Sequence, residues 1–368
     1  MILEMNCLTS NTKWPEFIEQ NFSGDREPFS AGIELLPDCN FKCIHCYAES
    51  DRKKSKRVMT TSEILQVIDI LEKHNCIDLF FTGGEALLHK DFCDIYRYAK
   101  KKGIMVSVLT NASLISEKHI NLWLEYPPEL VSVTMYGADE ATYNAITQNP
   151  YGYSMFVNGV KLLKDNGIPF EIKCIGMRQN YNDIHQIREF AKSMGINNSI
   201  LAWDIRPMND GSKEPISCRV SPLQAFMIEI TDPERKKFWD RVALNPDRKQ
   251  PTLRQKEGYL YPCAIAEQFV FITHDGYMQG CVKAINPRYN LLEGDFQTGW
   301  EYLGKEAVMK KASLKFPCRN CDKFRYCGQC TAAFVDENND PERPVEFYCE
   351  YGELLKMYMD QVEQATKK

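Results

Sequence analysis

The stretch that decides the fold is IELLPDCNFKCIHCY, residues 33–47, in which a short apolar run leads directly into three cysteines. Cys39, Cys43 and Cys46 are one thiol more than a disulfide needs and one fewer than a structural zinc ion usually takes. An iron–sulfur cluster of four irons normally has one thiolate on each iron. Three thiolates would leave one iron open, and an open metal position is where a substrate or cofactor binds. We call residues 39–46 the first cysteine loop.

The chain around this loop alternates apolar runs with helical patterns from residue 31 to residue 206. Thr60 and Glu63 form a capping-box pattern at the start of one helical segment, 60–74. Two later helical segments, 154–167 and 182–195, each end on a glycine. Strands that alternate with helices predict a parallel sheet with right-handed crossovers, and six units make a partial barrel rather than a closed one of eight. The candidate strands are 33–36, 77–81, 104–109, 130–135, 170–175 and 200–205.

The changes of pattern divide the chain into four parts. An N-terminal extension (1–30) precedes the partial barrel (31–206), a linker with helices (207–255) follows it, and a cysteine-rich domain (256–368) ends the chain. In that last part, apolar runs flank His274-Asp275-Gly276, and Asp-Gly between such runs predicts a hairpin. This hairpin would bring Cys263 and Cys281 together.

The composition is that of an ordinary globular protein. Among 368 residues, 44% are hydrophobic and the net charge is −5, which gives no reason to expect nucleic acid or an anionic membrane as partner. The N-terminus has no signal-peptide pattern, so we expect a cytoplasmic protein. In a reducing compartment, clustered cysteines among the 15 present would hold metal rather than disulfides. The scattered ones are interpreted as small core residues: Cys7, Cys76, Cys93, Cys174 and Cys218.

Three cysteines spaced C-x3-C-x2-C after the first strand of a six-unit barrel resemble the radical S-adenosylmethionine (SAM) superfamily. The resemblance implies a 4Fe–4S cluster whose open iron binds SAM and whose electron cleaves it to a 5′-deoxyadenosyl radical. Gly83, Gly84 and Glu85 match the family segment that binds the SAM amino group, although Ala86 stands where the family often has proline. The remaining SAM contacts would come from later strand ends: Thr110, Asn111, Ser132, Thr134 and Met177.

A second cysteine pattern fills the last third of the chain. Its two C-x2-C pairs are too close together for a zinc ribbon, and the whole pattern resembles the SPASM extension of radical SAM enzymes, which holds two auxiliary 4Fe–4S clusters. By position, the outer cysteines would hold one cluster: Cys318, Cys321, Cys327 and Cys349. The inner cysteines would hold the other: Cys263, Cys281 and Cys330. Cys330 is shifted by one residue from the family spacing. The missing fourth inner ligand would be a non-cysteine side chain, a scattered cysteine such as Cys218, or the substrate.

The SPASM resemblance implies a maturase that abstracts hydrogen from a ribosomally made peptide, with a thioether or carbon–carbon crosslink as the outcome. Peptide epimerisation and anaerobic sulfatase (formylglycine) maturation are alternatives; Val282, where sulfatase maturases usually have an aspartate, argues against the latter. A non-catalytic iron–sulfur electron carrier or sensor is the alternative from another class. The expected partners are the peptide, a separate leader-recognition protein and a flavodoxin- or ferredoxin-type electron donor. No general base is identified; the candidates are Tyr136, Asp204 and Arg206.

Overall fold

The computed structural model describes residues 26–48, 57–196 and 200–367. Most of the expected N-terminal extension, including Cys7, lies outside these residues. No helix within the described ranges is both long enough and apolar enough to cross a bilayer.

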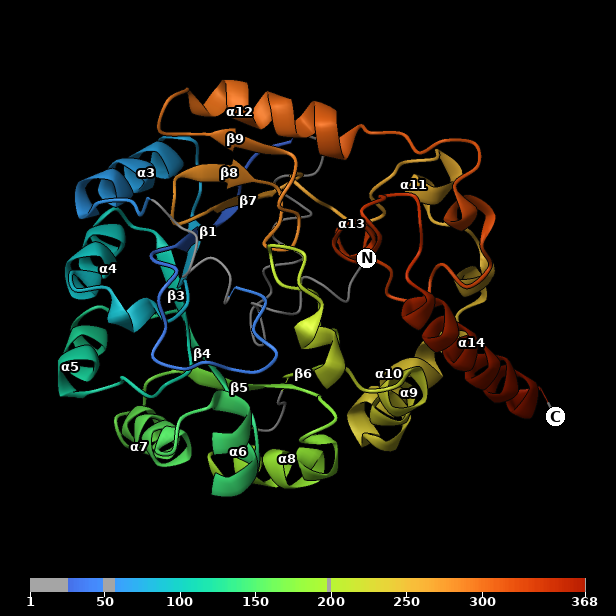
Figure 1. Cartoon of the computed structure of the whole chain (residues 1–368), viewed down its shortest axis with the longest axis horizontal. Helices are drawn as coiled ribbons and strands as arrows, with labels where there is room; N and C mark the ends of the chain where they lie inside the picture. The colour runs from blue at the N-terminus through green and yellow to red at the C-terminus, as the bar shows by residue number, and fades with distance from the viewer. Residues whose placement is uncertain (1–25, 49–56, 197–199, 368) are drawn as a thin grey trace.

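Nine strands of the described part of the chain form one curved sheet, in the order β6-β5-β4-β3-β2-β1-β7-β8-β9 (Figure 1). The first six are parallel to one another, as expected for the partial barrel. They are β1 (Ser30–Glu34), β2 (Asp78–Thr82), β3 (Met105–Thr110), β4 (Leu130–Thr134), β5 (Phe170–Ile175) and β6 (Ile200–Ala202). All six predicted strands are therefore present. The first begins at Ser30, before the predicted residue 33, and the last ends at Ala202, before the predicted residue 205.

Six α-helices cover the outer face of this parallel sheet, with their apolar sides against it (Figure 1). They are α3 (Thr61–Lys73), α4 (Phe92–Lys101), α5 (Glu117–Glu125), α6 (Glu140–Thr147), α7 (Gly152–Asp165) and α8 (Ile184–Ser193). The capping box is confirmed, since Thr60 and Glu63 each bond the other's backbone N–H at the start of α3. Gly167 and Gly195 follow α7 and α8 with φ of 65° and 89°, a left-handed conformation that favours glycine.

The cysteine-rich region continues the same sheet. The predicted hairpin is confirmed as β7 (Phe269–Ile272) and β8 (Tyr277–Gln279), and β9 (Arg288–Asn290) follows as a third antiparallel strand. Strand β7 pairs in parallel with β1, which gives the edge of the barrel a partner for its backbone groups. His274 in the hairpin turn and Glu34 at the end of β1 are 2.6 Å apart, Nδ1 to Oε2. The inner cysteines of the hairpin are thus tied to the strand that precedes the first cysteine loop.

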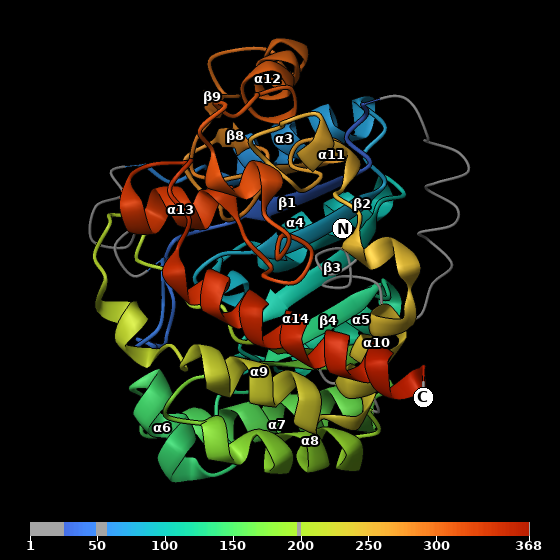
Figure 2. The same cartoon turned by 90° about the vertical axis from the view of Figure 1, so that its right-hand side faces the viewer.

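The predicted linker is helical and helps to build a second core. Helices α9 (Pro222–Thr231) and α10 (Pro233–Leu244) pack against the long C-terminal helix α14 (Glu346–Thr366), as Figure 2 shows. Buried Trp239, Tyr351 and Leu355 lie between them. The Glu229 carboxylate in this region accepts hydrogen bonds from Trp239 and Arg235. The three shorter helices of the C-terminal half are α11 (Leu253–Lys256), α12 (Phe296–Leu303) and α13 (Thr331–Asn338).

Candidate functional site

The first cysteine loop leaves the carboxyl end of β1 and is held in place by α6. The backbone N–H groups of Lys42 and Ile44 donate to the carbonyls of Thr147 and Ile146, each at 3.0 Å. Phe41 is buried and anchors the middle of the loop. The loop therefore lies at the edge of the sheet where parallel α/β folds place their chemistry.

The three thiols of this loop share one neighbour, Tyr136. Burial raises the pKa of the Tyr136 phenol well above its usual value, and Cys43, Cys39 and Cys46 add to the shift. The His45 ring packs against Tyr136 with ring centroids 5.3 Å apart, and burial lowers the pKa of His45 to about 4. Tyr136, a candidate base in the sequence, is thus a hydrophobic neighbour of the thiols that is difficult to ionise.

Gly83 and Gly84 lie against the residues that lead into the first cysteine loop. A Cβ on Gly83 would be 2.6 Å from the carbonyl oxygen of Leu36, and one on Gly84 would be 2.2 Å from that of Asp38. The backbone N–H groups of Gly84 and Glu85 donate to these same two carbonyls at 2.9 and 2.8 Å. These contacts require glycine at both positions, and they fix the loop against the end of β2.

Glu85 is buried, and its carboxylate is hydrogen-bonded to other residues of the chain. Its carboxylate accepts hydrogen bonds from the Thr110 hydroxyl and the Asn111 backbone N–H, both at 2.7 Å, and from the Leu87 backbone N–H at 3.1 Å. Burial raises its pKa, and these hydrogen bonds oppose the shift. Glu85 therefore joins the end of β2 to the end of β3, and the SAM ammonium group is not needed to satisfy it.

Asn111 connects this junction to the first cysteine. Its Nδ2 lies 3.8 Å from Cys39 Sγ and 3.0 Å from Asn40 Oδ1. Its Oδ1 accepts the backbone N–H of Ser113 at 2.9 Å. Asn111 is therefore beside the first cysteine loop, and Thr110 lies next to it with its hydroxyl on Glu85. Their contacts with SAM stay a prediction.

The other predicted SAM contacts are more widely spread. Ser132 is buried inside β4, and its Oγ has no hydrogen-bond partner among the described residues. Thr134 is half-buried at the end of β4. Met177 is fully buried with Ile205 and Cys218 in a small cluster that also touches Ile44 of the first cysteine loop. Met177 thus packs against the first cysteine loop in this structure, and its contact with SAM stays a prediction.

The inner cysteines gather around Tyr261, which precedes Cys263 by two residues. Burial raises the pKa of the Tyr261 phenol to about 12, with further contributions from Cys330, Cys263 and Cys281. Cys218, which the sequence offered as a fourth inner ligand, lies elsewhere: its Sγ is 3.8 Å from the carbonyl oxygen of Ile44. The structure therefore places Cys218 beside the first cysteine loop, and the prediction of Cys218 as a fourth inner ligand is wrong.

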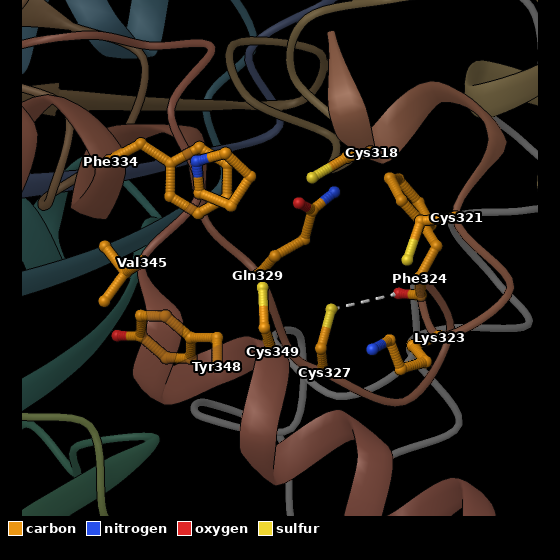
Figure 3. Close-up of a pocket in the computed structure, with 11 residues that line it drawn as sticks. Cys318, Cys321, Lys323, Phe324, Cys327, Gln329, Phe334, Val345, Tyr348 and Cys349 are labelled. Carbon is orange, nitrogen blue, oxygen red and sulfur yellow. Dashed lines mark hydrogen bonds between the residues drawn. The ribbon is translucent and has the colours of Figure 1, made fainter.

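The outer cysteines line one pocket, shown in Figure 3 with the thiols of Cys318, Cys321, Cys327 and Cys349 around it. The buried Gln255 amide donates to the carbonyls of Cys318 and Cys321 at 3.0 and 3.1 Å, which fixes the first pair. Gly352 of α14 lets that helix approach the third thiol, since a Cβ there would be 2.6 Å from Cys327 Cβ. Cys349 comes from the first turn of the same helix.

These outer thiols suit a cluster better than a single ion. Within the described ranges, no three His, Cys, Asp or Glu side chains converge closely enough to hold one metal ion. Burial raises the pKa of Cys318 to about 12, and the neighbouring thiols add to the shift. Four thiols around one pocket, of which those of Cys318 and Cys327 are buried, gain from binding iron, because it stabilises their thiolate forms. They fit the auxiliary 4Fe–4S cluster that the SPASM resemblance implies.

A polar group connects the first cysteine loop with the inner cysteines. The guanidinium carbon of Arg206 lies 4.1 Å from the centroid of the Tyr47 ring, and its Nη1 donates to the Lys283 carbonyl at 2.7 Å. The Lys283 ammonium pairs with the Asp204 carboxylate, which raises the pKa of Lys283, and Cys330 adds to the shift. We call Tyr47, Asp204, Arg206 and Lys283 the bridging group. Asp204 and Arg206 were named as candidates from the sequence, but Lys283 was missed. Its position two residues after Cys281 is the sequence feature that could have identified it.

The chain is similar in sequence to several known proteins. Residues 33–191 match the model of the radical SAM superfamily. The AdoMet-dependent heme synthase of Methanosarcina barkeri is 27% identical over 86% of this chain and 95% of its own length. The mycofactocin maturase MftC of Mycolicibacterium smegmatis is 23% identical over 89% of this chain and 84% of its own.

Among solved structures, Streptococcus suis SuiB bound to the precursor peptide SuiA superposes with a TM-score of 0.65. The match covers 86% of this chain and 74% of SuiB, at 14% sequence identity. At this identity the likeness concerns the fold, an α/β partial barrel followed by a cysteine-rich region.

Proposed function

We propose that this chain, a member of the radical SAM superfamily, is a peptide maturase that uses SAM to abstract a hydrogen atom from a peptide and so form a crosslink. When bound, the cluster on the first cysteine loop and SAM supply the radical that removes the hydrogen. The two auxiliary clusters would be held by the inner and outer cysteines.

One observation carries the proposal: the bridging group connects the first cysteine loop with the inner cysteines. Tyr47 directly follows Cys46, and Lys283 lies two residues past Cys281. Arg206 contacts both, through its stack on Tyr47 and its hydrogen bond to the Lys283 carbonyl. A substrate bound beside these residues would face the radical source on one side and an electron acceptor on the other. An oxidative crosslink needs this arrangement, because one hydrogen atom leaves to the 5′-deoxyadenosyl radical and one further electron and one proton must also leave the peptide.

The bridging group would hold polar parts of the peptide. The Lys283–Asp204 pair is partly exposed, with side-chain exposures of 39% and 33%, so either partner can exchange its ion pair for a substrate carboxylate or ammonium group. Arg206 is held by Asn209 Oδ1 at 2.6 Å as well as by the Lys283 carbonyl. We expect Arg206 to position Tyr47 and Lys283, and Lys283 and Asp204 to contact the substrate.

The test is anaerobic incubation of the reconstituted protein with SAM, a reductant and the small peptide encoded beside its gene. A crosslinked product is lighter than the peptide by two hydrogens and forms together with 5′-deoxyadenosine. A product that has the mass of the peptide in ordinary water, and that gains deuterium at a non-exchanging position in deuterated water, would instead indicate epimerisation. Conversion of a cysteine or serine in a sulfatase peptide to formylglycine would indicate sulfatase maturation. If SAM leaves the EPR spectrum of the reduced clusters unchanged, the chain is an electron carrier or sensor.

A second candidate is a reaction on an iron porphyrin. It is favoured by the similarity to an AdoMet-dependent heme synthase over 95% of that relative's length. The cations of the bridging group would suit the carboxylate side chains of such a substrate. In parallel assays with iron coproporphyrin, a change in the porphyrin mass with no change in the peptide would select this candidate.

A further inference from the structure

We infer that Gln329 is a positioning residue for the outer auxiliary cluster, whose side-chain N–H donates to a sulfur of that cluster and raises its reduction potential. The inference rests on the auxiliary-cluster part of the proposed function. It concerns a residue that the cysteine pattern does not single out.

The Gln329 side chain lines the same pocket as the four outer cysteines. Figure 3 shows its amide on the Cys318 side of the ring of sulfurs, directed toward that thiol. Both polar atoms of the amide, Nε2 and Oε1, are buried and have no hydrogen-bond partner among the described residues. Buried amides in folded proteins are almost always hydrogen-bonded, so this one calls for a partner that would occupy the pocket.

The chain directs Gln329 into the pocket by its backbone. Gly328 has φ of 61°, a left-handed conformation that turns the chain between Cys327 and Cys330. The Gln329 backbone N–H donates a hydrogen bond to the Cys327 sulfur. Backbone and side chain of one residue therefore both face the same set of sulfurs.

Other residues that line the pocket are less suited than Gln329 to donate a hydrogen bond to a cluster sulfur. The Lys323 ammonium pairs with Glu353 at 2.8 Å. Phe324, Phe334 and Val345 contribute apolar surface. A donor to cluster sulfur in such a setting favours the reduced form, because reduction adds negative charge to the cluster.

The test compares Gln329→Met with the wild type in the full, reconstituted chain. Methionine keeps the length of the side chain and removes the donor. EPR-monitored titration should give a lower midpoint for the outer cluster, with the equilibrium constant for reduction about tenfold smaller, equivalent to about 59 mV for one electron. Gln297→Met is the matched control, because Gln297 is exposed and its side-chain amide donates to Glu301 at 3.0 Å, away from the cysteines. Gln329→Glu, which places an acceptor where the donor was, should lower the midpoint further.

Unchanged midpoints in Gln329→Met and Gln329→Glu would overturn the inference. If a variant loses iron, its midpoint cannot be compared, so a second measurement uses the wild type. The EPR signal of the reduced outer cluster must show coupling to an exchangeable proton, and this coupling must disappear in deuterated water. Absence of the coupling would also overturn the inference. Iron content separates the two proposals. If Cys349→Ala holds as much iron as the wild type, the outer cluster itself is wrong; if it holds less and the midpoints are unchanged, only the role of Gln329 is wrong.

Discussion

The ammonium of Lys283 pairs with the carboxylate of Asp204, which joins the segment after the inner Cys281 to the segment after the last barrel strand. Replacing Lys283 with methionine leaves its backbone carbonyl available to Arg206 but removes the charge. We expect KM for the peptide to rise about tenfold, equivalent to about 1.4 kcal/mol of lost binding, as measured by product formation against peptide concentration.

The control for this variant is Lys311→Met. Lys311 lies over the Tyr259 ring, outside the bridging group, so its KM should equal that of the wild type. Equal KM values for the two variants would show that the bridging group does not contact the substrate.

Glu85 should be essential for the geometry of the first cysteine loop. Glu85→Gln replaces an oxygen that accepts an N–H or O–H with an NH₂ group, so at least one buried donor loses its partner. We expect the free energy of unfolding to fall by about 1–3 kcal/mol and SAM to bind more weakly, as measured by urea unfolding and by EPR titration with SAM. Glu72→Gln is the control, since Glu72 lies at the surface, 3.9 Å from Lys102. A Glu85→Gln protein as stable as this control would contradict the role assigned to Glu85.

Iron content should follow the three cysteine groups. The wild type is expected to hold about twelve irons, as three clusters of four. Cys43→Ala, Cys281→Ala and Cys321→Ala should each lose about one cluster in anaerobic reconstitution, measured by iron and sulfide analysis. Cys174→Ala is the matched control, because Cys174 is a buried core residue of β5. Equal iron in all four variants would refute the assignment of the ligands.

Burial of His119 should lower the free energy of unfolding of the protein in acid. Burial lowers the pKa of His119 to about 4, and its Nδ1 accepts the Ser116 backbone N–H at the start of α5. A base whose pKa is lowered on folding makes a contribution to the free energy of unfolding that is fully present above its unfolded pKa of about 6.5. This contribution is lost as the pH falls toward the folded pKa of about 4. We therefore expect the wild type to lose about 2–3 kcal/mol between pH 7 and pH 4.5 through this residue.

His119→Gln is the informative variant for this prediction, because glutamine at the third helical position can keep the capping box without titrating. Its unfolding free energy should depend less on pH over the same range. The same pH dependence in variant and wild type would show that His119 is not responsible.

Local patterns in the sequence were sufficient for most of the partial barrel. The capping box at Thr60 and the glycines after α7 and α8 act through neighbours in the chain, so their consequences could be predicted without the fold. The pairing of β7 with β1 could not, because it joins residues more than 200 positions apart and nothing local specifies which sheet edge the hairpin takes.

The grouping of the outer cysteines around one pocket could be predicted from the sequence, but the contacts that surround the cysteines could not. Gly83 and Gly84 were predicted from the family segment that binds the SAM amino group, and the sequence did not show that they pack on the residues before Cys39. Cys218 was offered to the inner group and lies beside Ile44. Such contacts depend on where separate strand ends meet in space, and one sequence does not contain that information.

The central claim is that the radical produced at the first cysteine loop takes its hydrogen from a peptide. The most direct measurement is the isotope content of 5′-deoxyadenosine after anaerobic turnover with a peptide deuterated at its carbon positions. The account predicts 5′-deoxyadenosine carrying deuterium, in an amount that matches the crosslinked product. Cleavage of SAM that yields only unlabelled 5′-deoxyadenosine, with the peptide unchanged, would contradict it.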